Sequence, residues 1–155
     1  MSVDALRKLF DINHQALGMN VKGLTHEESL IQPPGGGNCL NWVAGHIVAT
    51  RNLVLGLLGE EPIWGEAEAA RYKRGSAPIR DGGSAAPFDR ILADFSRSQE
   101  RIRAGLARLT DADLARERDK ETLADSLHFL QFHEAYHVGQ AGLLRRMAGK
   151  EGAIP

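Results

Sequence analysis

Apolar residues recur at intervals of three and four along most of the chain, which is the spacing of one face of an α-helix. The first such segment begins at Val3 and loses its pattern between Gly18 and Gly23. A helix is predicted there. Its inward positions are Val3, Leu6, Phe10, Asn13 and Leu17.

A second helix is predicted over residues 39–59, after a run of prolines and glycines at 33–37. Asn38 is the expected N-cap and Gly59 the expected C-terminal cap. The inward positions of this helix are Val43, His46, Ile47, Thr50, Leu53, Val54 and Leu57.

The same periodicity predicts two further helices. One has Pro87 in its first turn, where proline is favoured, and carries apolar positions over 88–109. The other begins at Thr122, with Asp125 as its capping partner, and ends before Gly149. No segment shows the alternation of a strand, so four long helices predict an all-α fold, an antiparallel four-helix bundle.

Between residues 60 and 86 the periodicity is lost. A connection this long within a compact domain is usually either functional or disordered. Its aromatic residues, Trp64 and Tyr72, favour a long ordered loop between the second and third helices. The chain as a whole, 1–155, is interpreted as a single domain.

A faint repeat divides the chain into halves. LTHEESL (24–30) and LTDADLA (109–115) each follow a long helix, and each precedes a helix that carries an inward histidine, His46 or His133. Thr25 and Glu28 have the spacing of a capping box. The repeat predicts two similar helical hairpins that face each other.

Composition narrows the function classes. Apolar residues make up 43% and charged residues 25% of the chain, and the net charge is −1, so no basic surface for nucleic acid or for an anionic membrane is expected. No apolar run approaches the roughly 18 residues of a membrane span. The lone cysteine, Cys39, excludes an internal disulfide. A cytoplasmic protein is expected.

Three histidines suggest a metal site. His133 and His137 are four residues apart, so both imidazoles project from one face of their helix. Together with His46 they would form a three-imidazole set with an open position, as in catalytic zinc sites, although nickel, manganese or iron would also accept it. The alternative is a polar network of buried histidines without metal. The remaining histidines, expected at surface or packing positions, are His14, His26 and His128.

The segment 133–137 also spells H-E-x-x-H, the zinc-binding string of metalloproteases, in which the glutamate is a general base. The context argues against a protease. Gln140 and Leu143 stand where metzincins have Gly and His, and Glu151 is the sole glutamate downstream. Glu134 is thus a candidate base, but a carboxylate on the helix surface or in a dimer interface is the favoured interpretation.

Four further residues are candidates for the site. Gln140 projects near His133 and would bond a ligand imidazole or a metal-bound water, or else is simply a polar residue near the end of the bundle. Asn13 would bond a ligand histidine or a neighbouring helix. Trp64 and Tyr72 would either wall a pocket above the metal or fix the loop to the bundle.

The segments NWVAGHIVATRN (41–52) and HFLQFHEAYHVGQ (128–140) resemble the DinB-like family, also called the DinB/YfiT family. Its pattern is a tryptophan shortly before a histidine on helix two, then H-x-x-x-H followed by x-Gly-Gln on the last helix. The matching positions are Trp42, His46, His133, His137, Gly139 and Gln140. The resemblance covers nearly the whole chain and implies a four-helix bundle, metal ligation by the three histidines, and a homodimer.

The resemblance also implies a range of activities. Relatives include transferases and isomerases that use low-molecular-weight thiols, and many members have no assigned reaction. A metal-dependent enzyme of thiol S-transferase or hydrolase type is therefore expected, with one divalent ion, a small-molecule substrate and a low-molecular-weight thiol as co-substrate. The alternative from another class is a non-enzymatic metal-binding or structural bundle.

Overall fold

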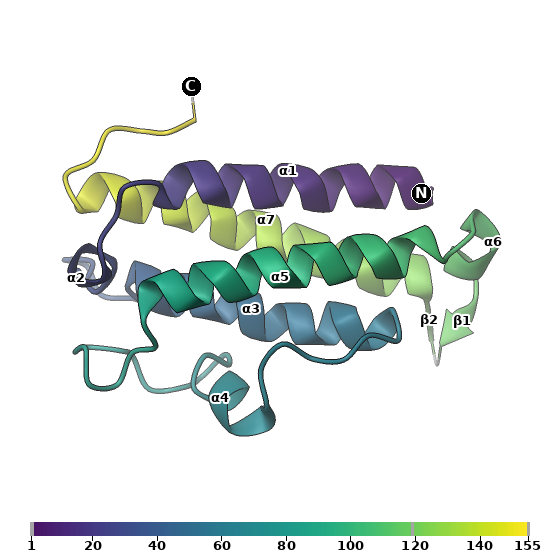
Figure 1. Ribbon diagram of the computed structural model, residues 1–155, viewed down its shortest axis with the longest axis horizontal. Coiled ribbons are helices and arrows are strands. Elements are labelled where there is room, and N and C mark those ends of the chain that lie inside the picture. Colours follow the sequence, from purple (N-terminus) through teal and green to yellow (C-terminus); the bar gives the residue numbers. More distant parts are fainter. Residues whose placement is uncertain (1, 119, 155) are drawn as a thin grey trace.

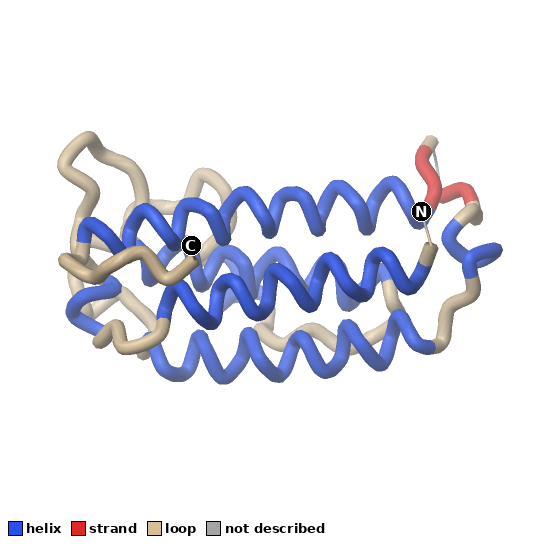
Figure 2. The backbone as a smooth tube through the Cα atoms, turned by 90° about the horizontal axis from the view of Figure 1, so that it is seen from above, coloured by secondary structure: helices blue, strands red, loops and turns tan. Residues whose placement is uncertain are grey.

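Four long helices lie side by side along one axis in the computed structural model, which describes residues 2–118 and 120–154 (Figures 1 and 2). They are α1 (Val3–Val21), α3 (Leu40–Leu57), α5 (Phe88–Ala107) and α7 (Leu123–Met147). The all-α bundle is confirmed. No helix in the described part of the chain has the length and apolar character needed to cross a membrane.

The repeated sequence has the same local structure in both halves. Each copy forms a short helix, α2 (His26–Ser29) after α1 and α6 (Asp111–Leu114) after α5. Each short helix begins with a capping box, and so does α7. The boxes pair Thr25 with Glu28, Thr110 with Asp113, and Thr122 with Asp125.

The two halves do not form separate hairpins. α1 packs against α5 and α7, and α3 packs against the same two helices, so the long helices of each half lie across the diagonal of the bundle. The principal packing is therefore between the halves. This is the arrangement that places α3 beside α7.

Two neighbouring pairs of helices run parallel, where the sequence pattern predicted an antiparallel order. On α1, Asn13 and Asn20 donate to the carbonyls of Gln131 and Val138 on α7, at 3.1 and 3.0 Å, and the equal spacing shows that these helices run the same way. Segment 58–87 returns along the bundle before α5 begins, so α3 and α5 are also parallel (Figure 1). A twenty-residue helix is about 30 Å long, and only a long connection can retrace it.

Three local predictions at the helix ends and faces were wrong. Cys39, not Asn38, is the N-cap of α3, and it makes no side-chain capping bond. Leu53 is 62% exposed, because the face of α3 that bears it borders Phe129 of α7 and stays open to solvent. A two-residue hairpin, β1 (Glu117–Arg118) with β2 (Glu121–Thr122), precedes α7; strands this short have no alternation to detect.

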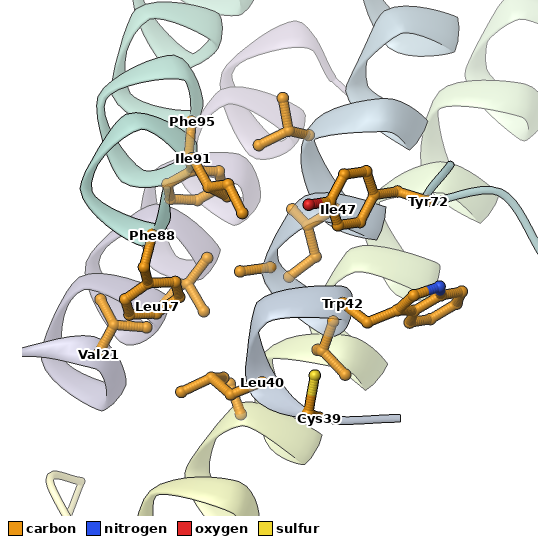
Figure 3. Close-up of a cluster of buried hydrophobic side chains, with 14 of the residues drawn as sticks. Leu17, Val21, Cys39, Leu40, Trp42, Ile47, Tyr72, Phe88, Ile91 and Phe95 are labelled. Atoms are coloured by element: carbon orange, nitrogen blue, oxygen red, sulfur yellow. The ribbon is translucent and has the colours of Figure 1, made fainter. Parts of the chain in front are cut away.

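The long loop is packed onto the bundle. It contains a short helix, α4 (Glu66–Ala70), and two buried aromatic side chains, Trp64 and Tyr72. Trp64 Nε1 donates to Asp94 on α5 at 2.6 Å. Tyr72 belongs to the larger apolar core, together with Ile47 of α3 (Figure 3). Of the two roles predicted for these aromatics, the structure shows the second, fixing the loop to the bundle.

Gly45 is what allows the loop to approach α3 so closely. A Cβ atom at this position would lie 2.3 Å from Cδ1 of Tyr72, far inside van der Waals contact. The glycine therefore leaves room for the tyrosine ring against the helix backbone, directly beside His46.

A buried ion pair joins three helices. Arg51 on α3 is fully buried, and its Nε and Nη2 donate to the two carboxylate oxygens of Glu134 on α7, at 2.7 and 2.8 Å. The remaining N–H groups donate to α5, at Ser98 Oγ, the Phe95 carbonyl and Gln99 Oε1. All five donors of the guanidinium are thus satisfied, and the group also lies 3.8 Å from the centre of the Phe95 ring.

The predicted exposure of Glu134 was therefore wrong. Its side chain is 4% exposed, since the helix turns it toward Arg51 of α3. A carboxylate held by both oxygens on a guanidinium is poorly placed to act as a general base.

Replacement of Glu134 by Ala should destabilise the protein by about 3–5 kcal/mol, because Arg51 would keep its charge in the core without a counter-ion. The matched control is Glu100→Ala, an exposed position on α5, which should change stability by less than about 0.5 kcal/mol. Urea unfolding of the two variants measures both effects. Equal midpoints for the two variants would contradict this account of the ion pair.

Candidate metal centre

The three predicted histidines converge where α3 packs against α7. His46 projects from α3, and His133 and His137 project from successive turns of α7. One nitrogen of each ring lies within 4.8 Å of those of the other two. The Nε2 atom of His133 is 3.3 Å from that of His46 and 3.2 Å from that of His137.

These separations match the ligand spacing of one small cation. Zinc–nitrogen bonds are about 2.0–2.1 Å long, so two nitrogens at a tetrahedral angle lie about 3.3–3.4 Å apart. The two measured Nε2 separations agree with this value. Two of the three separations therefore suit a divalent ion, and the ligand nitrogens of the third pair, His46 and His137, lie within 4.8 Å of each other.

Backbone and side-chain acceptors orient two of the rings. His46 Nδ1 donates to the carbonyl oxygen of Tyr72 at 2.6 Å, and His137 Nδ1 donates to Oε1 of Gln140 at 2.8 Å. Because both partners are acceptors, each ring carries its proton on Nδ1 and directs the lone pair of Nε2 toward the centre. Nε2 of His133 faces the Nε2 lone pairs of both His46 and His137 but can donate a proton to only one of them. A cation placed among the three nitrogens would satisfy all of them.

Burial favours the neutral form of all three rings. Burial lowers the pKa of His46, His133 and His137, and it lowers the pKa of His137 to about 4. The hydrogen bond from His137 to Gln140 acts in the opposite direction but is the smaller effect. Only the neutral form of imidazole binds metal, so this environment favours ligation.

Trp42 is part of the site as well as of the core. Its ring stacks on His46, with centroids 4.7 Å apart and an angle of 12° between the planes. Its Nε1 donates to Ser76 Oγ in the long loop at 2.9 Å. The sequence did not reveal this role, although a separation of four residues on a helix does put two side chains in contact.

The other candidates fall into two groups. Gln140 touches the cluster, through His137 rather than His133, because residues three apart on a helix are neighbours. Asn13 bonds the α7 backbone instead of a histidine. The side chains of Trp64 and Tyr72 lie in the core, and Tyr72 contributes to the site only through its carbonyl.

A cleft of about 600 Å³ adjoins the three histidines, a size typical of sites for small molecules. One wall is formed by α7, another by α3, and the rim by two loop segments. Its lining residues are Pro33, Gly36, Gly37, Asn38, Trp42, Val43, His46, Arg74, His133, Tyr136, His137, Gln140, Leu143, Leu144 and Met147.

Comparison with known proteins identifies the family. The family model for the DinB superfamily matches residues 9–141, a span that contains all three histidines and most of the bundle. A comparison with curated proteins gives no match. By its sequence, and in agreement with its helical fold, the chain belongs to the DinB superfamily.

Proposed function

We propose that this protein is a metal-dependent enzyme that holds one divalent ion through Nε2 of His46, His133 and His137 and acts on a small molecule in the adjoining cleft. The observation that carries the proposal is the convergence of three imidazoles, two of them oriented by hydrogen bonds at Nδ1, beside an open cleft. Structural zinc sites are closed by four protein ligands, whereas catalytic sites have three and keep one position for water or substrate. Within the described residues the cluster has three members.

When bound, a divalent ion at these nitrogens would act as a Lewis acid and lower the pKa of a water or thiol beside it. The chain's own residues hold that geometry. The Tyr72 carbonyl and Gln140 fix the rings of His46 and His137. Both thiol S-transfer and hydrolysis need this arrangement, and a low-molecular-weight thiol is the co-substrate that we propose for the first.

The ligand set accepts several metals. Imidazole binds zinc, nickel and iron, and manganese is also compatible with nitrogen donors. The buried ion pair of Glu134 argues against the metalloprotease alternative, because that mechanism needs the glutamate beside the bound water.

The metal content of the purified protein tests the proposal. Elemental mass spectrometry without added metal should find about one equivalent in the wild type, and His137→Ala should lose it, since loss of one of three ligands removes most of the affinity. His128→Ala is the matched control, because His128 is exposed on the same helix and lies outside the cluster. Absence of metal from the wild type, even after incubation with zinc, nickel or manganese, would leave only a polar network of histidines.

Removal of the ion with a chelator distinguishes a catalytic metal site from one that only stabilises the fold. An enzyme site should leave the helical circular dichroism at 25 °C nearly unchanged when emptied, because two apolar clusters already fill the bundle. A site that exists to stabilise the fold would instead unfold without its ion.

We also propose that the protein is a homodimer. Four large apolar side chains are exposed along one face of α7, about 21 Å in length, and Leu53 of α3 extends that surface. The four are Phe129, Phe132, Tyr136 and Leu143. Exposed apolar surface of this kind supports an interface with a second copy.

Sedimentation equilibrium tests the dimer. Phe132→Glu should shift the protein from dimer to monomer, because it puts a charge in the centre of the apolar face. Ile12→Glu on α1, a position of similar exposure (58% against 62%), should leave the dimer intact. A wild type that sediments as a 16.9 kDa species would contradict the proposal.

A further inference from the structure

Two hydrogen bonds hold a short stretch of the long loop against the metal centre. The carbonyl of Tyr72 accepts from His46 Nδ1, and the hydroxyl of Ser76 accepts from Trp42 Nε1. Because Trp42 also stacks on His46, both attachments end on the same part of α3. The residues between them are therefore fixed in position relative to the three histidines.

Arg74 lies at the tip of the turn formed by these residues. The N–H of Ser76 donates to the carbonyl of Lys73 at 3.0 Å and closes the turn, while Gly75 adopts a φ of 83°, which glycine reaches without strain. Arg74 is exposed and lines the cleft. It forms no hydrogen bond or ion pair with another residue among those that the structure describes.

Among the described residues that line the cleft, Arg74 is the only Asp, Glu, Lys or Arg side chain. The chain contains twenty Asp and Glu residues, yet none is among the residues that line the cleft. Imidazole ligands add no negative charge, so a divalent ion held by the three histidines would keep its two positive charges. Arg74 adds a third positive charge at the rim of the cleft. A cleft with this field attracts anions and disfavours cations.

Building on the proposed function, we propose that Arg74 binds a carboxylate of the substrate, so that the enzyme acts on small carboxylic acids whose other end reaches the metal. A guanidinium presents two parallel N–H donors that match a carboxylate. One arginine neutralises one negative charge, so a single carboxylate on the substrate is expected. The lining residues Val43, Leu144 and Met147 are apolar, so the body of the substrate should carry apolar surface.

Two thiols, one with a carboxylate and one with a neutral amide in its place, test the proposal. N-acetylcysteine carries a carboxylate, and N-acetylcysteine amide has the same thiol without it; a thiolate is a good ligand for the open position of zinc. Isothermal titration of the zinc-loaded protein at pH 7 should show at least roughly tenfold tighter binding of the acid, as expected for a charge-assisted hydrogen bond. Arg74→Gln should remove this preference.

The control variant is Arg80→Gln, which makes the same change of charge at an exposed position of the same loop, away from the cleft lining. It should keep the preference for the acid. Equal binding of acid and amide to the wild type, or an unchanged preference in Arg74→Gln, would overturn the role of Arg74. In either case, binding of the amide would still support an open position on the metal. If neither thiol binds, the proposed function itself fails, and the role of Arg74 fails with it.

Discussion

The buried ion pair between Arg51 and Glu134 fixes how α3 sits against α7, and the metal centre depends on that register. Glu134 is next to His133 in the chain, and Arg51 lies little more than one helical turn beyond His46. Because the guanidinium has all five donors satisfied by α5 and α7, a shift of α3 along its axis would leave a buried charge without partners. The same contact that holds the helices together therefore brings the three imidazoles to ligand distance.

The long loop supplies a second constraint. By retracing the bundle it makes α3 and α5 parallel, and on its way it passes over the part of α3 that carries His46. Gly45 leaves room for the Tyr72 ring, and the Tyr72 carbonyl then sets the orientation of the His46 imidazole. The loop that brings the chain back along the bundle thus also orients His46, and the same loop contains the turn that carries Arg74.

Much of this architecture could be predicted from sequence because it is encoded locally. Helical periodicity and capping boxes act over three or four residues, and they gave the long helices, the start of α7 at Thr122 and the paired imidazoles of His133 and His137. The position of His46 on an inward face, together with the family pattern, added the third histidine.

What escaped prediction depends on contacts between distant segments. Nothing near Glu134 in the chain indicates Arg51, which is 83 residues away, so the glutamate was expected at the surface. The role of Tyr72 comes from its backbone carbonyl, which no side-chain pattern can reveal. The direction of α5 likewise depends on the path of the loop, and periodicity within a helix contains no information about it.

X-ray absorption spectroscopy of the zinc-loaded protein tests the central claim most directly. The account predicts three imidazole nitrogens at about 2.0–2.1 Å and one further light atom, which a small thiol such as mercaptoethanol should replace with sulfur at about 2.3 Å. A first shell of four protein ligands that the thiol leaves unchanged, or one with fewer than three imidazoles, would contradict an open three-histidine site.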